Sequence, residues 1–343
     1  MHRIVSRCFL LAAWASLLMP LPRASAADLP RCDVTPLPGR TIALAIDGEQ
    51  RAAWHFGDDA PRPFFFPFHG PDGGLLTRMG HPGAENHDHH LSIWFAHHDV
   101  DGLSFWQDES GCTIRQRFWM VQDSGDDEGV LAVRLEWLDP AGAAILEQDM
   151  VAALRPLGDG EHALEIQSTF RPADGRDAVT LGKTNFGFLA VRVAASLSVF
   201  FGDGTLTNSE GLTGEPAIFG TPAAWVDYSG SVAVGRGEKR RGTTAGITFF
   251  DHPANPRYPS RWHVRSDGWM GASFCFDAPY EVTAAAPLTL RYLLYAHRGT
   301  ATDAAERITD VQHAFYARPG WSVRPATSSE PHRQWIVARG GEE

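Results

Sequence analysis

The sequence predicts an all-β protein, built as a large antiparallel β-sandwich with one helix near the C-terminal end. Short strand-like runs, with alternating or continuous apolar residues, recur along the chain. The 343 residues include 34 glycines and 23 prolines, which supply many turns and leave little room for long helices. One stretch, at residues 302–315, has apolar residues at helical spacing. Together these features favour two packed layers of β-structure.

The strand-like runs lie at residues 41–46, 93–95, 131–138, 163–170, 189–194, 246–250, 272–276 and 288–297. In the last run the residues alternate with a period of two, so one face is predicted to carry Leu288, Leu290, Tyr292, Leu294 and Ala296. The helix is expected to have Thr302 as its N-cap and to pack Ile308, Val311 and Phe315 against a sheet.

Residues 1–26 are typical of a secretory signal peptide. Arg3 and Arg7 precede an apolar core at residues 8–21, and Ala24-Ser25-Ala26 provides the small residues of a cleavage site. We therefore expect a periplasmic or secreted protein with a leader at residues 27–39, a single β-sandwich domain at residues 40–318 and a loosely ordered tail at residues 319–343. No later run reaches the roughly 18 apolar residues of a membrane span, so no membrane partner is expected.

The charge and the cysteines restrict the partners and the redox chemistry. The net charge is −11, and it would become −14 after cleavage because residues 1–26 hold three arginines and no acids. Such a balance lacks the basic footprint of a nucleic-acid-binding protein and favours neutral substrates or bound cations.

Three cysteines would remain after cleavage, which permits one disulfide and one buried thiol. Cys275 is the candidate thiol, and the pairing among Cys32, Cys112 and Cys275 stays open.

Six of the fifteen histidines lie between residues 81 and 98, interleaved with carboxylates. Imidazoles beside carboxylates suit either divalent-metal binding or proton transfer near neutral pH. His87 and His89 alternate, so they are candidate metal ligands together with Glu85, Asp88 or Asp251. The same two imidazoles would equally serve as a general acid and base without a metal. No spacing matches H-E-x-x-H or a zinc finger, so the cluster indicates a site without naming zinc.

Later segments supply further candidates. Lys183 precedes a strand-like run in which Arg192 is a lone charge. As buried cations, both are predicted to orient a substrate oxygen or to form an ion pair. Glu210 lies in a Gly-rich turn, where it is a general acid or a turn carboxylate. Residues 251–265 contain three prolines and are expected to form a rigid ligand-carrying loop. The candidates in this loop for holding a sugar ring are Asn255, Arg257, Trp262, His263 and Arg265. The alternative is that the tryptophan only packs and the arginines lie on the surface. His252 is a catalytic candidate.

Over residues 62–317 the chain resembles the family labelled methane oxygenase PmoA. The resemblance rests on RPFFFP at 62–67, GLLTR at 74–78, NHDHHLSIWFAHHDVDGLSFW at 86–106, GKTNFGFLAVR at 182–192, NSEG at 208–211, WVDYSG at 225–230 and DHPANPRYPSRWHVR at 251–265. The sequence departs from that pattern at His98 and Asp101, where glycine and asparagine are common. A membrane methane monooxygenase subunit needs several transmembrane helices, which are lacking in this sequence. The resemblance instead implies a β-sandwich similar to that of galactose mutarotase, a fold found in sugar-active proteins. The larger supersandwich form of this fold is included in the expectation.

These observations lead to one functional expectation with several alternatives. We expect an exported carbohydrate-active enzyme, a lyase or hydrolase, that cleaves a glycoside or modified-sugar C–O bond by histidine-centred acid/base chemistry. The catalytic candidates are His90, His97, Lys183, Glu210 and His252. The alternatives are a sugar epimerase or mutarotase, a non-catalytic glycan-binding protein and a redox metalloprotein. A divalent metal would fit this chemistry, whereas the missing nucleotide-binding motifs argue against a nucleotide cofactor. The oligomeric state is left open.

An enzyme of this kind also needs its acid/base and substrate-orienting groups within a few ångströms of one reacting atom. The histidine-rich segment and residues 251–265 are therefore predicted to converge around one pocket, with His90 close to His252 or His263.

Overall fold

The computed structural model describes residues 29–81, 83, 87–330 and 332–340. The predicted signal peptide and the candidate ligand Glu85 lie outside these residues. Within the described part, two eight-stranded antiparallel sheets face each other, so the all-β sandwich prediction is confirmed. None of the helices in these ranges combines the length and apolar character needed to cross a bilayer.

The first sheet has the strand order β1-β2-β3-β4-β5-β11-β16-β15. Its strands are β1 (Cys32–Leu37), β2 (Thr41–Ile46), β3 (Glu49–His55), β4 (Phe64–Phe68), β5 (Ile93–His97), β11 (Gly187–Arg192), β16 (Trp269–Ser273) and β15 (Arg261–Arg265). The leader expected at residues 27–39 therefore supplies β1, which pairs with β2 over six residues of each strand. Alternation explains this pairing, because Cys32 and Val34 are buried in the core.

The second sheet has the order β12-β13-β14-β18-β9-β8-β7-β6. Its strands are β12 (Thr205–Asn208), β13 (Trp225–Val234), β14 (Arg241–Asp251), β18 (Leu288–Arg298), β9 (Glu161–Pro172), β8 (Ala144–Gly158), β7 (Gly129–Leu138) and β6 (Thr113–Asp123). A small two-stranded sheet joins β10 (Ala178–Leu181) and β17 (Tyr280–Thr283). Short helical turns occupy Asp108–Ser110, Ala195–Leu197, Gly237–Lys239 and α1 (Glu215–Ile218).

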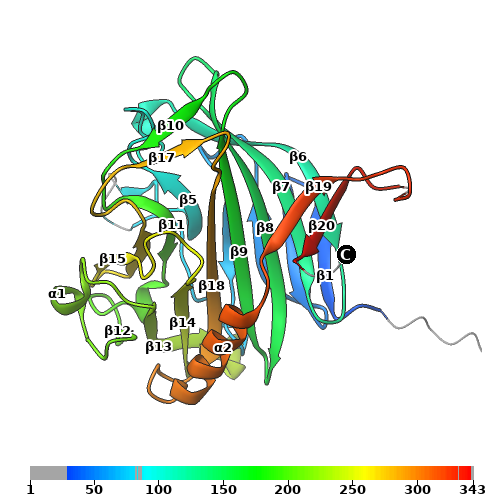
Figure 1. Ribbon diagram of the computed structural model, residues 1–343. Helices are drawn as coiled ribbons and strands as arrows, with labels where there is room; N and C mark the ends of the chain where they lie inside the picture. The colour runs from blue at the N-terminus through cyan, green and yellow to red at the C-terminus, as the bar shows by residue number, and fades with distance from the viewer. Residues whose placement is uncertain (1–28, 82, 84–86, 331, 341–343) are drawn as a thin grey trace, which may run out of the picture.

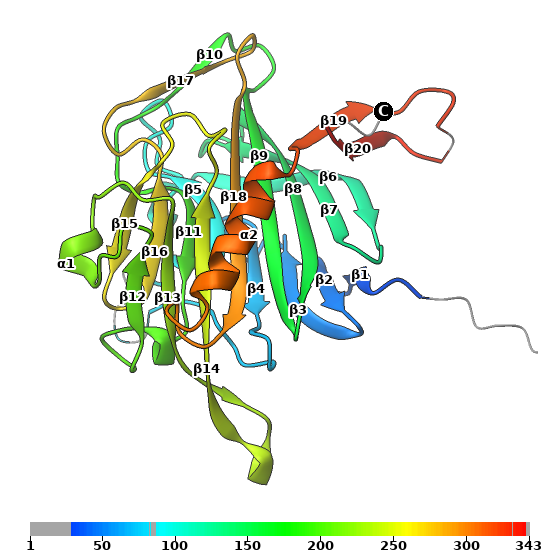
Figure 2. The same cartoon turned by 60° about the horizontal axis from the view of Figure 1, so that its bottom comes forward.

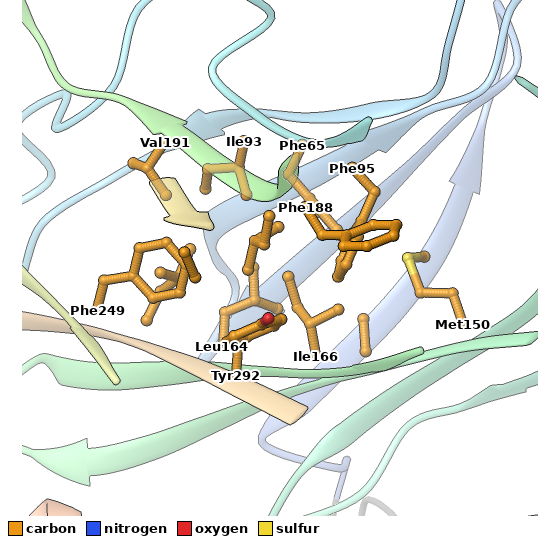
Figure 3. Packing of buried hydrophobic residues seen from close by; sticks show 14 of the residues in the cluster. Phe65, Ile93, Phe95, Met150, Leu164, Ile166, Phe188, Val191, Phe249 and Tyr292 are labelled. Carbon is orange, nitrogen blue, oxygen red and sulfur yellow. The ribbon is translucent and has the colours of Figure 1, made fainter. Parts of the chain in front are cut away.

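The main core fills the space between the two sheets. Figure 3 shows Phe65, Ile93 and Phe188 of the first sheet opposite Leu164 and Tyr292 of the second. The predicted face of β18 is confirmed, because its alternate residues are buried in this core: Leu288, Leu290, Tyr292, Leu294 and Ala296. The other face of the same strand packs beneath a helix.

That helix is α2 (Ala305–Ala317), which lies across the outer face of the second sheet (Figure 1, Figure 2). Ile308, Val311 and Phe315 are buried as predicted. The predicted N-cap at Thr302 is wrong, because the helix begins at Ala305 and its N-cap residue is Ala304. The hydroxyl and amide of Thr300 donate instead to the Asp303 carboxylate, which closes a turn before the helix.

Part of the tail that was expected to be loosely ordered forms two strands, at residues 321–325 and 335–339. β19 (Trp321–Pro325) and β20 (Trp335–Arg339) form a hairpin beside β6, at the right of Figure 1. Val323 and Val337 of this hairpin pack on an apolar patch of the second sheet. The buried Glu165 carboxylate also accepts hydrogen bonds from Arg339, which fastens the hairpin to β9.

The three cysteines of the described chain are all reduced and buried. Cys275 is a buried thiol, as expected, and burial raises its pKa to about 12. The permitted disulfide does not form. Cys32 begins β1, Cys112 precedes β6 and Cys275 follows β16, so the fold distributes them over three separate elements.

Candidate functional site

The outer face of the first sheet carries chemistry on β11, β16 and β15. In β11, Leu189 and Val191 enter the core, so the intervening Ala190 and Arg192 take the outer face. Across the sheet, Arg192 lies opposite Trp269. Pairs of this kind have Cβ atoms about 5 Å apart.

The next strand extends this pattern. In β15, Trp262 and Val264 belong to the core, which leaves His263 and Arg265 on the outer face. Arg265 lies opposite Trp269, and His263 lies opposite Gly271. The pairing register of three strands therefore brings two arginines, a tryptophan and a histidine onto one face.

A pocket of about 260 Å³ opens over these strands. The loop before β5 and the loop after it complete the walls. The lining residues are His87, His89, His90, His98, Trp106, Gln107, Phe186, Arg192, His263, Arg265, Asp267 and Trp269. Ligand cavities usually have about 300–1,000 Å³, so this pocket suits a molecule of single-ring size.

Indole rings form one wall of the pocket. The ring centroids of Trp106 and Trp269 are 5.3 Å apart, and Trp94 lies behind them, 5.1 Å from Trp269. The His90 ring lies 4.8 Å from Trp269 and 5.5 Å from Trp94. Because these rings are almost fully buried, they present a dry apolar surface beside the histidines.

Arg62 positions the two pocket loops, one before β5 and one after it. Its side chain is 1 % exposed, and its guanidinium donates to the carbonyls of His89 (3.2 Å) and Trp106 (3.1 Å). It also donates to the Asp108 carboxylate at 2.6 Å. A rigid planar fork of this kind fixes two loops at once, which a flexible ammonium does less well.

Asp267 joins the charged groups of the pocket. One carboxylate oxygen accepts a hydrogen bond from Arg192 Nη1 at 2.7 Å, and the other lies 2.9 Å from His81 Nε2. Burial alone would raise the pKa of Asp267, but the hydrogen bond and the charge of Arg192 hold it below its ordinary value. Asp267 is therefore an ionised counter-charge.

Three of the pocket histidines, His89, His90 and His263, are held neutral. Burial lowers the pKa of His263 to about 4, although its hydrogen bond to the Asn185 carbonyl opposes this shift. Burial, followed by the charges of His89 and Arg192, holds the pKa of His90 far below its ordinary value. Burial also lowers the pKa of His89, and the cation of Arg62 adds to the effect. These rings are therefore uncharged at neutral pH and are able to accept protons.

One ring has a defined tautomer. His263 Nδ1 lies 3.0 Å from the Asn185 carbonyl oxygen. A carbonyl only accepts hydrogen bonds, so Nδ1 must carry the proton and Nε2 must carry the lone pair in the neutral ring. Any proton that His263 takes from a ligand therefore goes to Nε2.

The predicted convergence of the two motifs is found for His263. His87, His89 and His90 from the first motif and His263 and Arg265 from the second line one pocket, together with Arg192. His252 is not part of it. Its ring packs against Phe315 of α2, and Nε2 lies 3.0 Å from Arg291, so protein groups already surround it.

Several other candidates lie outside the pocket. His97 is buried within β5, stacks on Phe188 and donates from Nε2 to the Gly182 carbonyl at 3.0 Å. Lys183 is exposed, which contradicts its expected burial. Glu210 is exposed at a turn, where its carboxylate accepts a hydrogen bond from Ser209. It therefore has the role of a turn carboxylate, one of the two roles expected for it.

The loop at residues 251–265 is only partly a ligand loop. Asn255 donates to Asp251 and to the Arg291 carbonyl, so it fixes the loop to β18. Arg257 donates to the carbonyls of residues 278 and 279. Trp262 is fully buried in the core, because the strand period directs it inward while His263 faces outward.

The proposed metal ligands do not form a set in the described residues. Among those residues no group of three His, Cys, Asp or Glu side chains is placed to hold a metal ion. The His87 and His89 ring centroids are 6.1 Å apart. Asp251 is buried and accepts hydrogen bonds from Asn255 and the Ser260 amide, so it is not available as a third ligand.

Sequence reasoning missed Asp267, Trp269, Trp106 and Phe186. A signal for the first two was present, because Asp267-Gly268 separates two strand-like runs at residues 261–265 and 269–273. An Asp-Gly pair between such runs indicates a hairpin, and the hairpin places Trp269 beside Arg265.

The fold and the pocket define an all-β sandwich protein with a histidine- and tryptophan-lined site on the outer face of one sheet. The chain belongs to a family of unknown function, DUF6807, which matches residues 41–310. Comparison with curated proteins found none that matches. The family brings no activity with it, so the function has to be argued from the site.

Proposed function

We propose that the protein is a carbohydrate-active enzyme that cleaves a C–O bond of a glycoside or modified sugar by histidine acid/base chemistry. The observation that carries this proposal is the convergence of His90 and His263 with Trp106 and Trp269 around one pocket of single-ring size. Apolar C–H faces of a sugar ring stack on indoles, while the hydroxyl groups require hydrogen-bonding partners at the edge. The proposed periplasmic or secreted location rests on the sequence of residues 1–26.

His263 is the proposed general base. Its ring is neutral at pH 7, its proton is held on Nδ1 by the Asn185 carbonyl, and its lone pair is on Nε2. General bases of this kind contribute about 10²- to 10⁴-fold to a reaction rate. The neutral rings of His89 and His90 lie in the same pocket, and a ring N–H there would donate a hydrogen bond to the leaving oxygen.

Within this class we favour elimination over hydrolysis. A glycoside hydrolase ordinarily needs two carboxyl groups across the scissile bond. Among the described lining residues only Asp267 carries a carboxylate, and it is already bonded to Arg192 and close to His81. In an elimination, His263 removes a proton next to an electron-withdrawing group, and that electron pair forms a C=C bond as the C–O bond breaks. The leaving oxygen takes a proton from water, and the proton held by His263 returns to the solvent, so no water is added to either product.

The test is a screen of the purified protein on neutral glycosides, acidic glycosides and keto-glycosides, each with and without chelator. The proposal predicts a new unsaturated sugar or a new reducing end, with turnover lost in His263→Gln. Binding of sugars without conversion of any panel member would identify a glycan-binding protein and overturn the proposal. Interconversion of sugar epimers without bond cleavage would also overturn it.

A further inference from the structure

Arg192 is buried but only partly satisfied. Its side chain is 1 % exposed, and Nη1 donates to Asp267 at 2.7 Å. Its Nε and Nη2 atoms are buried and have no hydrogen-bond partner among the described residues. An unpaired buried N–H is costly, and buried charged groups normally have all their donors occupied. The residue lines the pocket, so a ligand is the natural partner for these donors.

The two unpaired donors lie on the same edge of the guanidinium. Nε–H and Nη2–H point in parallel, which is the fork that accepts the two oxygens of a carboxylate. A single hydroxyl offers only one oxygen to the two parallel donors and carries no charge to balance the buried guanidinium. The chemistry of this edge therefore selects a planar anion over a neutral sugar.

The charges around the pocket agree with this selection. The chain as a whole has a net charge of −11, yet among the described lining residues Arg192 and Arg265 stand against one carboxylate, that of Asp267. Arg265 is additionally paired with Glu215, outside the lining. The cation of Arg192 is one of the influences that lower the pKa values of His87 and His90, so its field extends into the pocket.

The strand register relates the fork to the proposed base. Arg192 lies opposite Trp269, and β16 separates β11 from β15, which bears His263. Two strand spacings are roughly 10 Å, a gap that a long arginine and an imidazole can close around one ring. A carboxylate held at Arg192 would place its sugar ring near Trp269.

We propose that the ligand of this pocket is an acidic sugar of the uronate class, with its carboxylate on the Nε–Nη2 edge of Arg192. This inference rests on the proposed function and names its substrate class. The net charge of the whole chain favours a neutral substrate, whereas the lining of this pocket favours an acidic one. In the elimination, Arg192 neutralises the carboxylate, so the neighbouring C–H becomes acidic enough for His263. That proton moves to His263 Nε2, the C=C bond forms, and the C–O bond on the next carbon breaks. The leaving oxygen takes a proton from water, and the proton on His263 returns to the solvent.

The test compares ligands on the unmodified protein. Calorimetric titration at pH 7 uses glucuronate and galacturonate, their methyl esters, and glucose and galactose. Charge-assisted bonds predict that the acids bind about tenfold to hundredfold more tightly than the esters or neutral sugars. Equal affinity for acid, ester and neutral sugar, or no binding of any of them, would overturn the inference. No variant is needed for this comparison, so misfolding does not obscure it.

Two substitutions then locate the carboxylate. Arg192→Met should abolish the preference for the acid while leaving the weaker binding of neutral sugars. Asp267→Asn removes the counter-charge, so it should tighten uronate binding and leave the esters unchanged. A preference that persists in Arg192→Met, or uronate affinity that falls in Asp267→Asn, would place the carboxylate elsewhere.

The outcomes also separate this inference from the proposed activity. If the protein cleaves neutral glycosides and does not bind uronates, the substrate class is wrong and the enzymatic proposal stands. If it binds uronates selectively but cleaves nothing, the acidic ligand stands and the enzymatic proposal fails.

Discussion

Replacing His263 by glutamine tests the proposed base directly. Glutamine is close to histidine in size, and its amide nitrogen corresponds in position to Nε2, so the hydrogen bond from Nδ1 to the Asn185 carbonyl is lost. It has no basic nitrogen, so proton abstraction is lost. We expect kcat/KM to fall by about 10²- to 10⁴-fold, which corresponds to about 3–5 kcal/mol of transition-state stabilisation. The free energy of unfolding should fall by only about 1 kcal/mol, because one hydrogen bond is lost.

The pH profile gives an independent measure of the same group. The pKa of His263 is lowered to about 4, so the ring is protonated and inactive as a base below that pH. The kcat/KM of the wild-type protein should rise with pH up to about 4 and remain level toward neutral pH. In His263→Gln this acidic limb should be absent, because the titrating base is gone.

His252→Gln is the matched control. His252 is also buried, and burial lowers its pKa to about 4, but its ring packs against α2. This variant should lose stability through its contacts with Arg291 while keeping wild-type kcat/KM. The reasoning is refuted if His263→Gln keeps full activity, or if both variants lose activity equally.

Three further predictions concern stability and positioning. Burial would lower the pKa of His297, but the Asp227 carboxylate and its hydrogen bond raise it. A raised pKa means that the protonated ring stabilises the fold. The free energy of unfolding lost in His297→Gln should therefore be largest below about pH 6.5 and decline as the pH rises through the elevated pKa. Urea unfolding across pH measures this difference, and a difference that does not vary with pH would contradict it. Arg339→Met removes one partner of the buried Glu165 and should destabilise the protein by about 3 kcal/mol in urea, whereas a loosely attached tail predicts no change. Arg62→Met should raise KM for the sugar more than it lowers kcat, because it frees two pocket loops; steady-state kinetics would contradict it if only kcat changed.

The sequence was sufficient for the fold because its signals are local and periodic. The alternation from Leu288 to Ala296 identified the buried face of β18, and the spacing of Ile308, Val311 and Phe315 identified the face of α2. The tail was misjudged because its order depends on distant partners. Arg339 and Glu165 are far apart in the chain, and their pairing leaves no local pattern in the sequence.

The site was predicted in part for the same reason. The density of histidines marked His89 and His90, and the 251–265 motif marked His263 and Arg265. The inward or outward direction of each residue was not resolved there, so Trp262 was taken for a ligand-binding residue when it belongs to the core. A consistent period of two through β15 would have separated Trp262 from His263.

The central claim concerns the reaction, and isotope-labelled water tests it most directly. The purified protein would be incubated with an acidic glycoside in water enriched in heavy oxygen, and the products analysed by mass spectrometry and ultraviolet absorbance. Elimination through His263 and Arg192 predicts an unsaturated acidic sugar that absorbs in the ultraviolet, with no heavy oxygen in either product. Incorporation of heavy oxygen into a saturated product, or complete absence of cleavage, would contradict the account.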